Sequence, residues 1–256
     1  MAKKVAPPSK GKALVKKSSD TGVIPIDQKR PAYTKSEDVA PPVESGGFLP
    51  TLKLLQALSP EVDNSDDKFI NGASQGDIVV VDGSGPTLFD GEEGVTIIPV
   101  CVRKLYNEWI PRKQGGGFVA SYQSREEMEQ HFERGHEMQV SIDYLCVTDE
   151  VNPEKKLTPV VVQFNSATKL GVARELAEKI KEFRTMTGVQ YKISGLKKKN
   201  KAGQPYYNFK IVPMGWVPKD LYDQIQKIRE ENEEAFSSAS LRTIDEGAAD
   251  DKKSAF

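Results

Sequence analysis

Alternation of apolar and polar residues predicts that the middle of the chain is built mainly from β-strands. A period of two residues places successive side chains on opposite faces of a half-buried sheet. Pro99 interrupts one of these segments and predicts an edge or a bulge there. Shorter runs at 76–81 and 118–122 also have strand character. The five clearest segments are 95–106, 138–147, 158–164, 189–194 and 206–212.

A different spacing predicts helices between and after these strands. Residues 166–183 carry an apolar stripe at helical spacing, with Ser166 placed to cap the helix and Gly188 to mark its end. Ser124 and Glu127 form a capping box for a short helix that reaches about Arg134. A last amphipathic helix starts at Pro218. The apolar segment 48–58 predicts a short helix that docks on the core and ends at Ser59.

The order of these elements predicts a fold. Three strands, a helix and a two-stranded hairpin follow one another as in a five-stranded OB barrel. Residues 109–135 would then be a large insertion, holding a helix and a hairpin, between the first two strands. The predicted class is therefore β-rich α+β, with an OB-fold-like barrel and a C-terminal helix.

Composition divides the chain into three parts: a disordered basic arm over 1–45, one OB-like domain over 46–236, and a disordered acidic tail over 237–256. Residues 1–35 hold nine Lys/Arg against two Asp, a net charge of +7, although the whole chain carries only −1. No apolar run is long enough to span a bilayer, and no secretory signal follows the N-terminus. Cys101 and Cys146 indicate buried thiols rather than a disulfide framework, which favours the cytoplasm.

The hairpin formed by 189–194 and 206–212 carries the strongest functional signal. Residues 192–210 include six lysines and no acid, and two tyrosines follow the connection. Lysines in this connection would neutralise phosphates, and an exposed aromatic ring would stack on a base. Alternation points Tyr206 outward as the stacking residue and Tyr207 into the core. The other interpretation is a hairpin tip that lysines keep solvated. The candidate residues are Lys192, Lys197, Lys198, Lys199, Lys201, Tyr206 and Lys210.

A second segment, 103–118, interleaves basic and aromatic residues beside three glycines. Such a segment suits the tracking of a single-stranded backbone with stacking on its bases. Equally, its aromatic residues could pack the edge of the barrel. The candidate nucleic-acid-binding residues are Lys104, Tyr106, Trp109, Arg112, Lys113 and Phe118.

The acidic C-terminus forms a third candidate site, for a protein partner. A terminal aromatic residue with its carboxylate would fill a basic-rimmed pocket, although a solvated tail could also end in Phe by chance. The candidate residues are Asp245, Glu246, Asp250, Asp251 and Phe256.

His131, His136 and the two cysteines match no metal-ligand spacing, and no catalytic constellation is visible. We therefore expect no metal, no cofactor and no enzymatic activity.

Three stretches of the chain resemble single-stranded DNA-binding proteins of tailed bacteriophages. They are residues 49–62 (LPTLKLLQALSPEV), the Ile98-Pro-Val motif with residues 108–118 (EWIPRKQGGGF), and the acidic end with its terminal Phe256. The resemblance implies an OB core, sequence-independent coating of single strands, and recruitment of replication or recombination proteins by the tail. Two alternatives stay open: a phage structural or assembly protein whose charged tails contact other subunits, and a nuclease. The protein would act in the host cytoplasm, without a membrane, and could form homo-oligomers.

Overall fold

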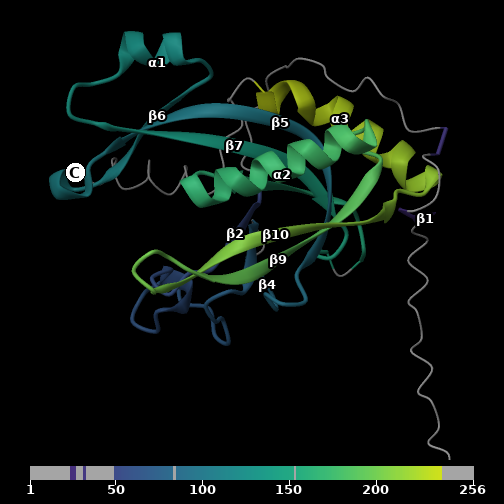
Figure 1. The fold of residues 1–256 in the computed structure, drawn as a ribbon, viewed down its shortest axis with the longest axis horizontal. Helices are drawn as coiled ribbons and strands as arrows, with labels where there is room; N and C mark the ends of the chain where they lie inside the picture. The colour runs from purple at the N-terminus through teal and green to yellow at the C-terminus, as the bar shows by residue number, and fades with distance from the viewer. Residues whose placement is uncertain (1–23, 27–30, 33–48, 83–84, 153, 238–256) are drawn as a thin grey trace, which may run out of the picture.

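The computed structural model describes residues 24–26, 31–32, 49–82, 85–152 and 154–237. Within these residues the chain forms one strongly curled sheet with three α-helices (Figure 1). The strands are β1 (Ile24–Pro25), β2 (Thr51–Leu54), β3 (Ile78–Asp82), β4 (Gly85–Phe89), β5 (Val95–Ile110), β6 (Gly117–Tyr122), β7 (Glu137–Thr148), β8 (Thr158–Phe164), β9 (Val189–Lys199) and β10 (Pro205–Trp216). The helices are α1 (Arg125–His131), α2 (Ala167–Phe183) and α3 (Lys219–Ser237), with 3-10 turns η1 (Pro60–Val62) and η2 (Arg112–Gln114).

The long strand β5 connects the two parts of the sheet. Its first residues, Val95–Ile97, pair with β9, and the rest of the strand pairs with β7. The β5–β7 register shifts between Pro99 and Cys101, which confirms the irregularity predicted at Pro99. The strand order is β1-β10-β9-β5-β7-β8-β2-β3-β4, with β6 on β5. This curled, open sheet is consistent with an OB-like β-rich fold, and the five predicted strands are β5, β7, β8, β9 and β10.

Two parts of the sequence prediction are wrong. The segment 48–58 contains no helix in its described part: Thr51–Leu54 is strand β2, which pairs antiparallel with β3 and parallel with β8. The strand is only four residues long and continues directly into apolar Leu55, so its alternation is too short to be distinguished from a helical pattern. The first half of the connection 195–204 is strand as well, because β9 continues to Lys199, and β10 begins at Pro205.

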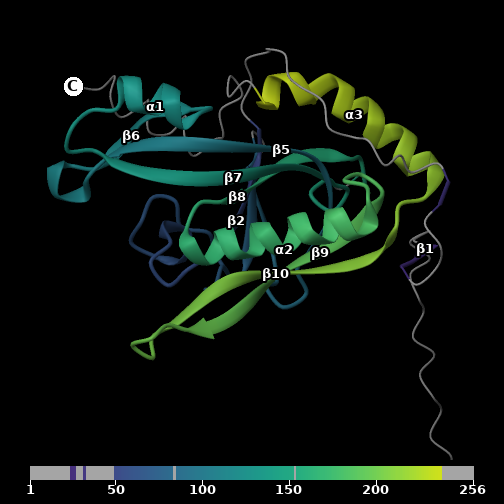
Figure 2. The same ribbon diagram turned by 45° about the horizontal axis from the view of Figure 1, so that its top comes forward.

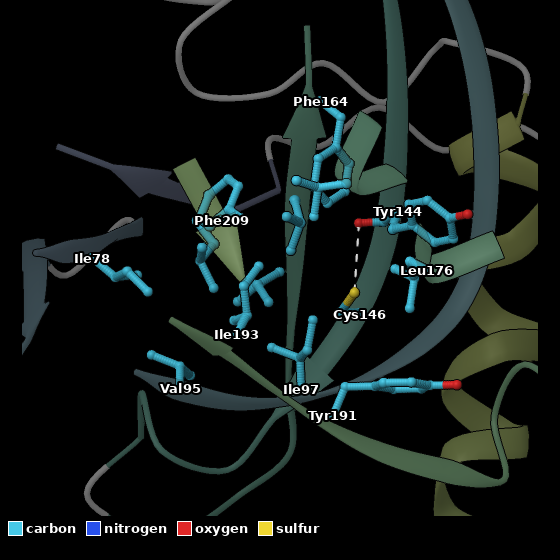
Figure 3. Close-up of a cluster of buried hydrophobic side chains, with 14 of the residues drawn as sticks. Ile78, Val95, Ile97, Tyr144, Cys146, Phe164, Leu176, Tyr191, Ile193 and Phe209 are labelled. Carbon is cyan, nitrogen blue, oxygen red and sulfur yellow. Dashed lines mark hydrogen bonds between the residues drawn. The ribbon is translucent and has the colours of Figure 1, made fainter. Parts of the chain in front are cut away.

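The inner face of the sheet holds the main core, and α2 covers it. Core side chains from β5, β7, β8, β9 and β10 converge on one cluster, where the rings of Phe164 and Phe209 meet edge to face at 5.8 Å (Figure 3). Helix α2 contributes Val172, Ala173 and Leu176, whereas Ala177 is exposed. The helix begins at the Ser166 cap, as predicted. It ends earlier than Gly188, at the left-handed residue Arg184.

Helix α3 covers the opposite, outer face of the sheet. Tyr222, Ile225 and Phe236 from α3 pack with Leu145 and Val161 of β7 and β8 in a second core cluster. This packing makes α3 an integral part of the fold, because each fully buried side chain of this size contributes about 1.5–3 kcal/mol.

A buried ion pair fixes the end of α3 to the sheet. Arg103 of β5 lies 3.2 Å from the Asp143 carboxylate of β7 and donates to the Phe236 carbonyl at 3.1 Å. The guanidinium also lies 4.4 Å from the centre of the Phe236 ring. Both charges are almost completely buried, so removing either partner would be strongly destabilising.

A single glutamine bridges the gap between β2 and β10. Gln56, just after β2, donates from its amide to the Tyr207 carbonyl at 3.0 Å and accepts from the Tyr207 backbone N–H at 3.1 Å. These are the two bonds that a neighbouring strand would make. Gly76 allows the approach, because it has φ of +99° and a Cβ there would lie 2.4 Å from the Tyr207 ring.

Replacing Gln56 by Leu should destabilise the protein. The Tyr207 N–H and C=O would lose their partners, and an unpaired buried backbone group costs about 1–3 kcal/mol. Chemical denaturation measures the free energy of unfolding. Gln130→Leu, on the exposed side of α1, is the control and should change that free energy by no more than about 0.5 kcal/mol. Equal effects of the two substitutions would contradict a bridging role.

Candidate nucleic-acid interface

The β9–β10 hairpin presents the predicted lysines on rigid, paired strands. Lys197, Lys198 and Lys199 lie in β9 opposite Tyr207, Tyr206 and Pro205 of β10. All three lysines are exposed. They therefore occupy fixed positions on both faces of the hairpin instead of lying in a loop.

A tight turn closes this hairpin. The Asn200 side chain accepts from the backbone N–H groups of Ala202 and Gln204 at 3.0 and 2.9 Å. Gly203 supplies the positive φ of +79° that the turn requires. Lys201, in the turn, and Lys210, in β10, are exposed, and Lys192 is half-buried.

The two tyrosines of the hairpin lie on opposite faces, in line with the expected alternation. Tyr207 packs against the inner core, and the Lys197 ammonium lies 5.9 Å from its ring centre. Tyr206 lies opposite Lys198 on the other face and is half-buried. Of the two rings, Tyr206 is the one that the core does not hold.

In the second predicted segment, the basic and aromatic residues separate into two groups. Lys104 is exposed on β5 and donates to the Tyr106 hydroxyl at 2.7 Å, with its ammonium 4.7 Å from the Tyr106 ring centre. Lys113, in η2, is exposed, whereas nothing is described for the side chain of Arg112. Phe118 is buried against Trp109, with ring centres 5.4 Å apart in an edge-to-face contact. These last two rings hold the β5–β6 hairpin together, so neither is free to stack on a base in this conformation.

The structure brings the two hairpins to one side of the molecule. The arm formed by β5, β6 and β7 and the β9–β10 hairpin extend in the same general direction in both ribbon views (Figures 1 and 2). In an OB fold these positions correspond to the two connections that border the nucleic-acid site. The candidate tail residues Asp245, Glu246, Asp250, Asp251 and Phe256 lie outside the described residues.

Glu108 is an organising residue that the sequence analysis did not assign. Its carboxylate is buried and accepts from the Tyr122 hydroxyl at 2.6 Å and from the Glu133 backbone N–H at 2.9 Å. It also lies 2.6 Å from Nδ1 of His136. These contacts fasten the α1 segment to the β5–β7 arm. The sequence analysis could not assign this role, because the three partners of Glu108 lie 14 to 28 residues away along the chain.

The surroundings of Glu108 favour its ionised form. Burial acts to raise the pKa of this carboxyl, but the hydrogen bonds from Tyr122, Glu133 and His136 outweigh it and hold the pKa below its usual value of 4.5. The same contact, together with burial, raises the pKa of Tyr122 to about 12. Both groups are therefore fixed in one protonation state at neutral pH.

Within the described ranges, no three His, Cys, Asp or Glu side chains gather as a metal site. Cys101 and Cys146 are free and buried, and burial raises the pKa of Cys101 to about 12, which keeps it a thiol. No described helix has the length and apolar character that crossing a membrane requires.

The Glu108 cluster predicts a pH-dependent contribution to stability. A depressed carboxyl pKa stabilises the folded state above the usual value of 4.5, and this contribution is lost as the pH falls through the folded-state pKa. Glu108→Gln should lower the free energy of unfolding at neutral pH by about 1–3 kcal/mol. The difference from the unchanged protein should shrink in denaturation curves recorded below pH 4.5. Glu126→Gln, exposed on α1, is the control; a pH-independent loss in Glu108→Gln would argue against this assignment.

Comparison with known proteins identifies the family of the chain. No curated protein and no solved structure gives a significant match. The family model of the Pam3 phage gp34-like proteins matches residues 43–235, about three quarters of the chain. The match includes every strand from β2 to β10, together with α1, α2 and nearly all of α3. The chain therefore belongs to the family of Pam3 phage gp34-like proteins.

Proposed function

We propose that this phage protein binds single-stranded DNA without sequence preference and acts in phage DNA replication, recombination or repair. The observation that carries the proposal is the β9–β10 hairpin, in which six lysines and no acid lie between Lys192 and Lys210. Same-face residues of a strand are about 6.6 Å apart. Flexible lysine side chains at that spacing can reach successive phosphates of an extended strand.

Aromatic side chains near the lysines favour a single strand over a duplex. Tyr206 lies beside Lys198 on one hairpin, and Tyr106 lies beside Lys104 on the other. Stacking on an unpaired base requires such rings and tolerates any sequence, because every base has a π-face.

Two of the three described helices, α1 and α3, are poorly suited to enter the major groove of a duplex, whereas α2 carries four basic residues against three acids. Recognition in the major groove uses a helix or a β-ribbon, and a basic face attracts the phosphates. Helix α3 carries six acids against three basic residues, and α1 carries three acids against Arg125. Both helices would repel the phosphates of a duplex.

The remaining parts of the proposal concern the binding domain and the C-terminal tail, and the tail lies outside the described residues. The OB-like barrel would supply the binding domain, and the C-terminal residues 245–256 would recruit replication or recombination proteins in the host cytoplasm. The competing hypothesis is a phage assembly protein whose charged ends contact other subunits. Binding measurements separate the two, because an assembly role needs no affinity for DNA.

The direct test is fluorescence anisotropy with labelled oligo-dT and a matched duplex at low and moderate salt. We expect tight binding to the single strand, weak binding to the duplex, and an affinity that falls steeply with salt because counterions are released. Absence of binding to either nucleic acid would reject this function and favour the assembly role.

Replacing Lys197, Lys198 and Lys199 by Ala should weaken oligo-dT binding and flatten its salt dependence. Each lost phosphate contact lowers the slope of log K against log salt by about 0.7 for single strands. The control replaces the exposed helical residues Lys181, Lys219 and Lys227 by Ala, which removes the same charge elsewhere. If both triple variants lost affinity equally, net charge and not the hairpin would explain binding.

A further inference from the structure

Helix α3 closes a face of the sheet that OB folds use for nucleic acid. In that fold, the second and third strands bind the ligand together with the two bordering connections. The corresponding strands are β7 and β8, whose outward side chains Leu145, Val147 and Val161 are completely buried in the cluster with α3. The Arg103 contacts to Phe236 fix the end of that helix. A bound strand must therefore use another part of the sheet.

The opposite face of the β5–β7 arm is partly exposed: Val102, Lys104 and Met138 are exposed, whereas Ile142 packs against the inner core. Val102, Lys104 and Tyr106 alternate along β5 with the buried residues Arg103 and Leu105, so they point away from the face to which Arg103 and Phe236 belong. In β7, Ile142 lies opposite Lys104, Val140 opposite Tyr106, and Met138 opposite Glu108. We call this surface the arm strip: Val102, Lys104, Tyr106, Met138, Val140 and Ile142.

The composition of the arm strip suits nucleobases. Val102 and Met138 are 40% and 45% exposed, so both offer apolar surface to a ligand. Tyr106 offers a ring and Lys104 a charge within the same surface. Apolar and aromatic contacts accept any base, and methionine adapts its shape to different partners.

Charges on the two sides of the arm strip give a bound strand an orientation. Helix α1 lies on one side of the β5–β7 arm and the β9–β10 hairpin on the other in both views (Figures 1 and 2). Exposed Glu126, Glu129 and Glu133 make the α1 side acidic, whereas the hairpin side carries the lysines. Phosphates are repelled from the first side and attracted to the second.

We propose that the bases of the bound strand lie on the arm strip, with the phosphates turned toward the β9–β10 hairpin. This inference rests on the proposed function and adds Val102 and Met138 to the contact residues. It also places the strand on the side of the sheet away from α3.

A pair of charge variants distinguishes this orientation from a loss of binding that is caused by misfolding. Val102→Glu with Met138→Glu should weaken oligo-dT binding, whereas Val102→Lys with Met138→Lys, at the same positions, should bind at least about tenfold more tightly than the Glu variant at low salt. The control, Gln224→Glu with Lys227→Gln, makes the same charge change of −2 on exposed residues of α3 and should bind nearly as the unchanged protein does.

The outcomes separate this inference from the function on which it rests. Equal affinities of the Glu and Lys variants would overturn the arm strip as the base-binding surface. The arm strip would also be overturned if the affinity of the control variant for oligo-dT fell as much as that of the Glu variant. Net charge would then explain the loss of binding. Both results leave DNA binding itself intact. Failure of the unchanged protein to bind oligo-dT would reject the function and the arm strip together.

Discussion

The continuity of β5 is the constraint on which the rest of the fold depends. One strand of 16 residues pairs with β9 at its start and with β7 along its remaining length. The register shift at Pro99 lies where the strand passes from one partner to the other, and it allows the sheet to bend there. Because both hairpins are attached to the same strand, its curvature sets their relative positions. The inner core and α2 then fill the concave side, and α3 covers the convex side.

The two hairpins differ in what holds them. The Gln56 side chain holds the β9–β10 hairpin at Tyr207, the third residue of β10, and the segment beyond that point carries the exposed Lys198, Lys199 and Lys201. The β5–β7 arm is stabilised from within by Trp109, Phe118 and the buried Glu108 cluster. One hairpin thus carries most of the lysines, and the other combines a packed interior with exposed apolar side chains. In the function that we propose, the first would supply most of the attraction for phosphates and the second most of the contact with bases.

Much of this architecture could be predicted from the sequence, because alternation and capping are local signals. The alternating residues of β7 and the Ser166 cap of α2 identified their elements directly. Strand β2 was misread because its alternation covers only four residues before apolar Leu55, which is too short to be distinguished from a helical pattern. Lys197–Lys199 were taken for a loop, since three consecutive lysines give no hydrophobic pattern although β10 pairs with them. Gln56 and Glu108 could not be assigned, because their partners lie far away in the sequence and only the folded sheet brings them together.

The contact between Arg103 and the end of α3 has a consequence for where the folded domain stops. Arg103 reaches the carbonyl and the ring of Phe236, so the guanidinium depends on residues near the last described position. A chain shortened to residue 235 would take the Phe236 carbonyl and ring away from the buried guanidinium and shorten α3 on the outer face of the sheet. The folded domain therefore extends at least to Phe236, which is held fixed against the central strand.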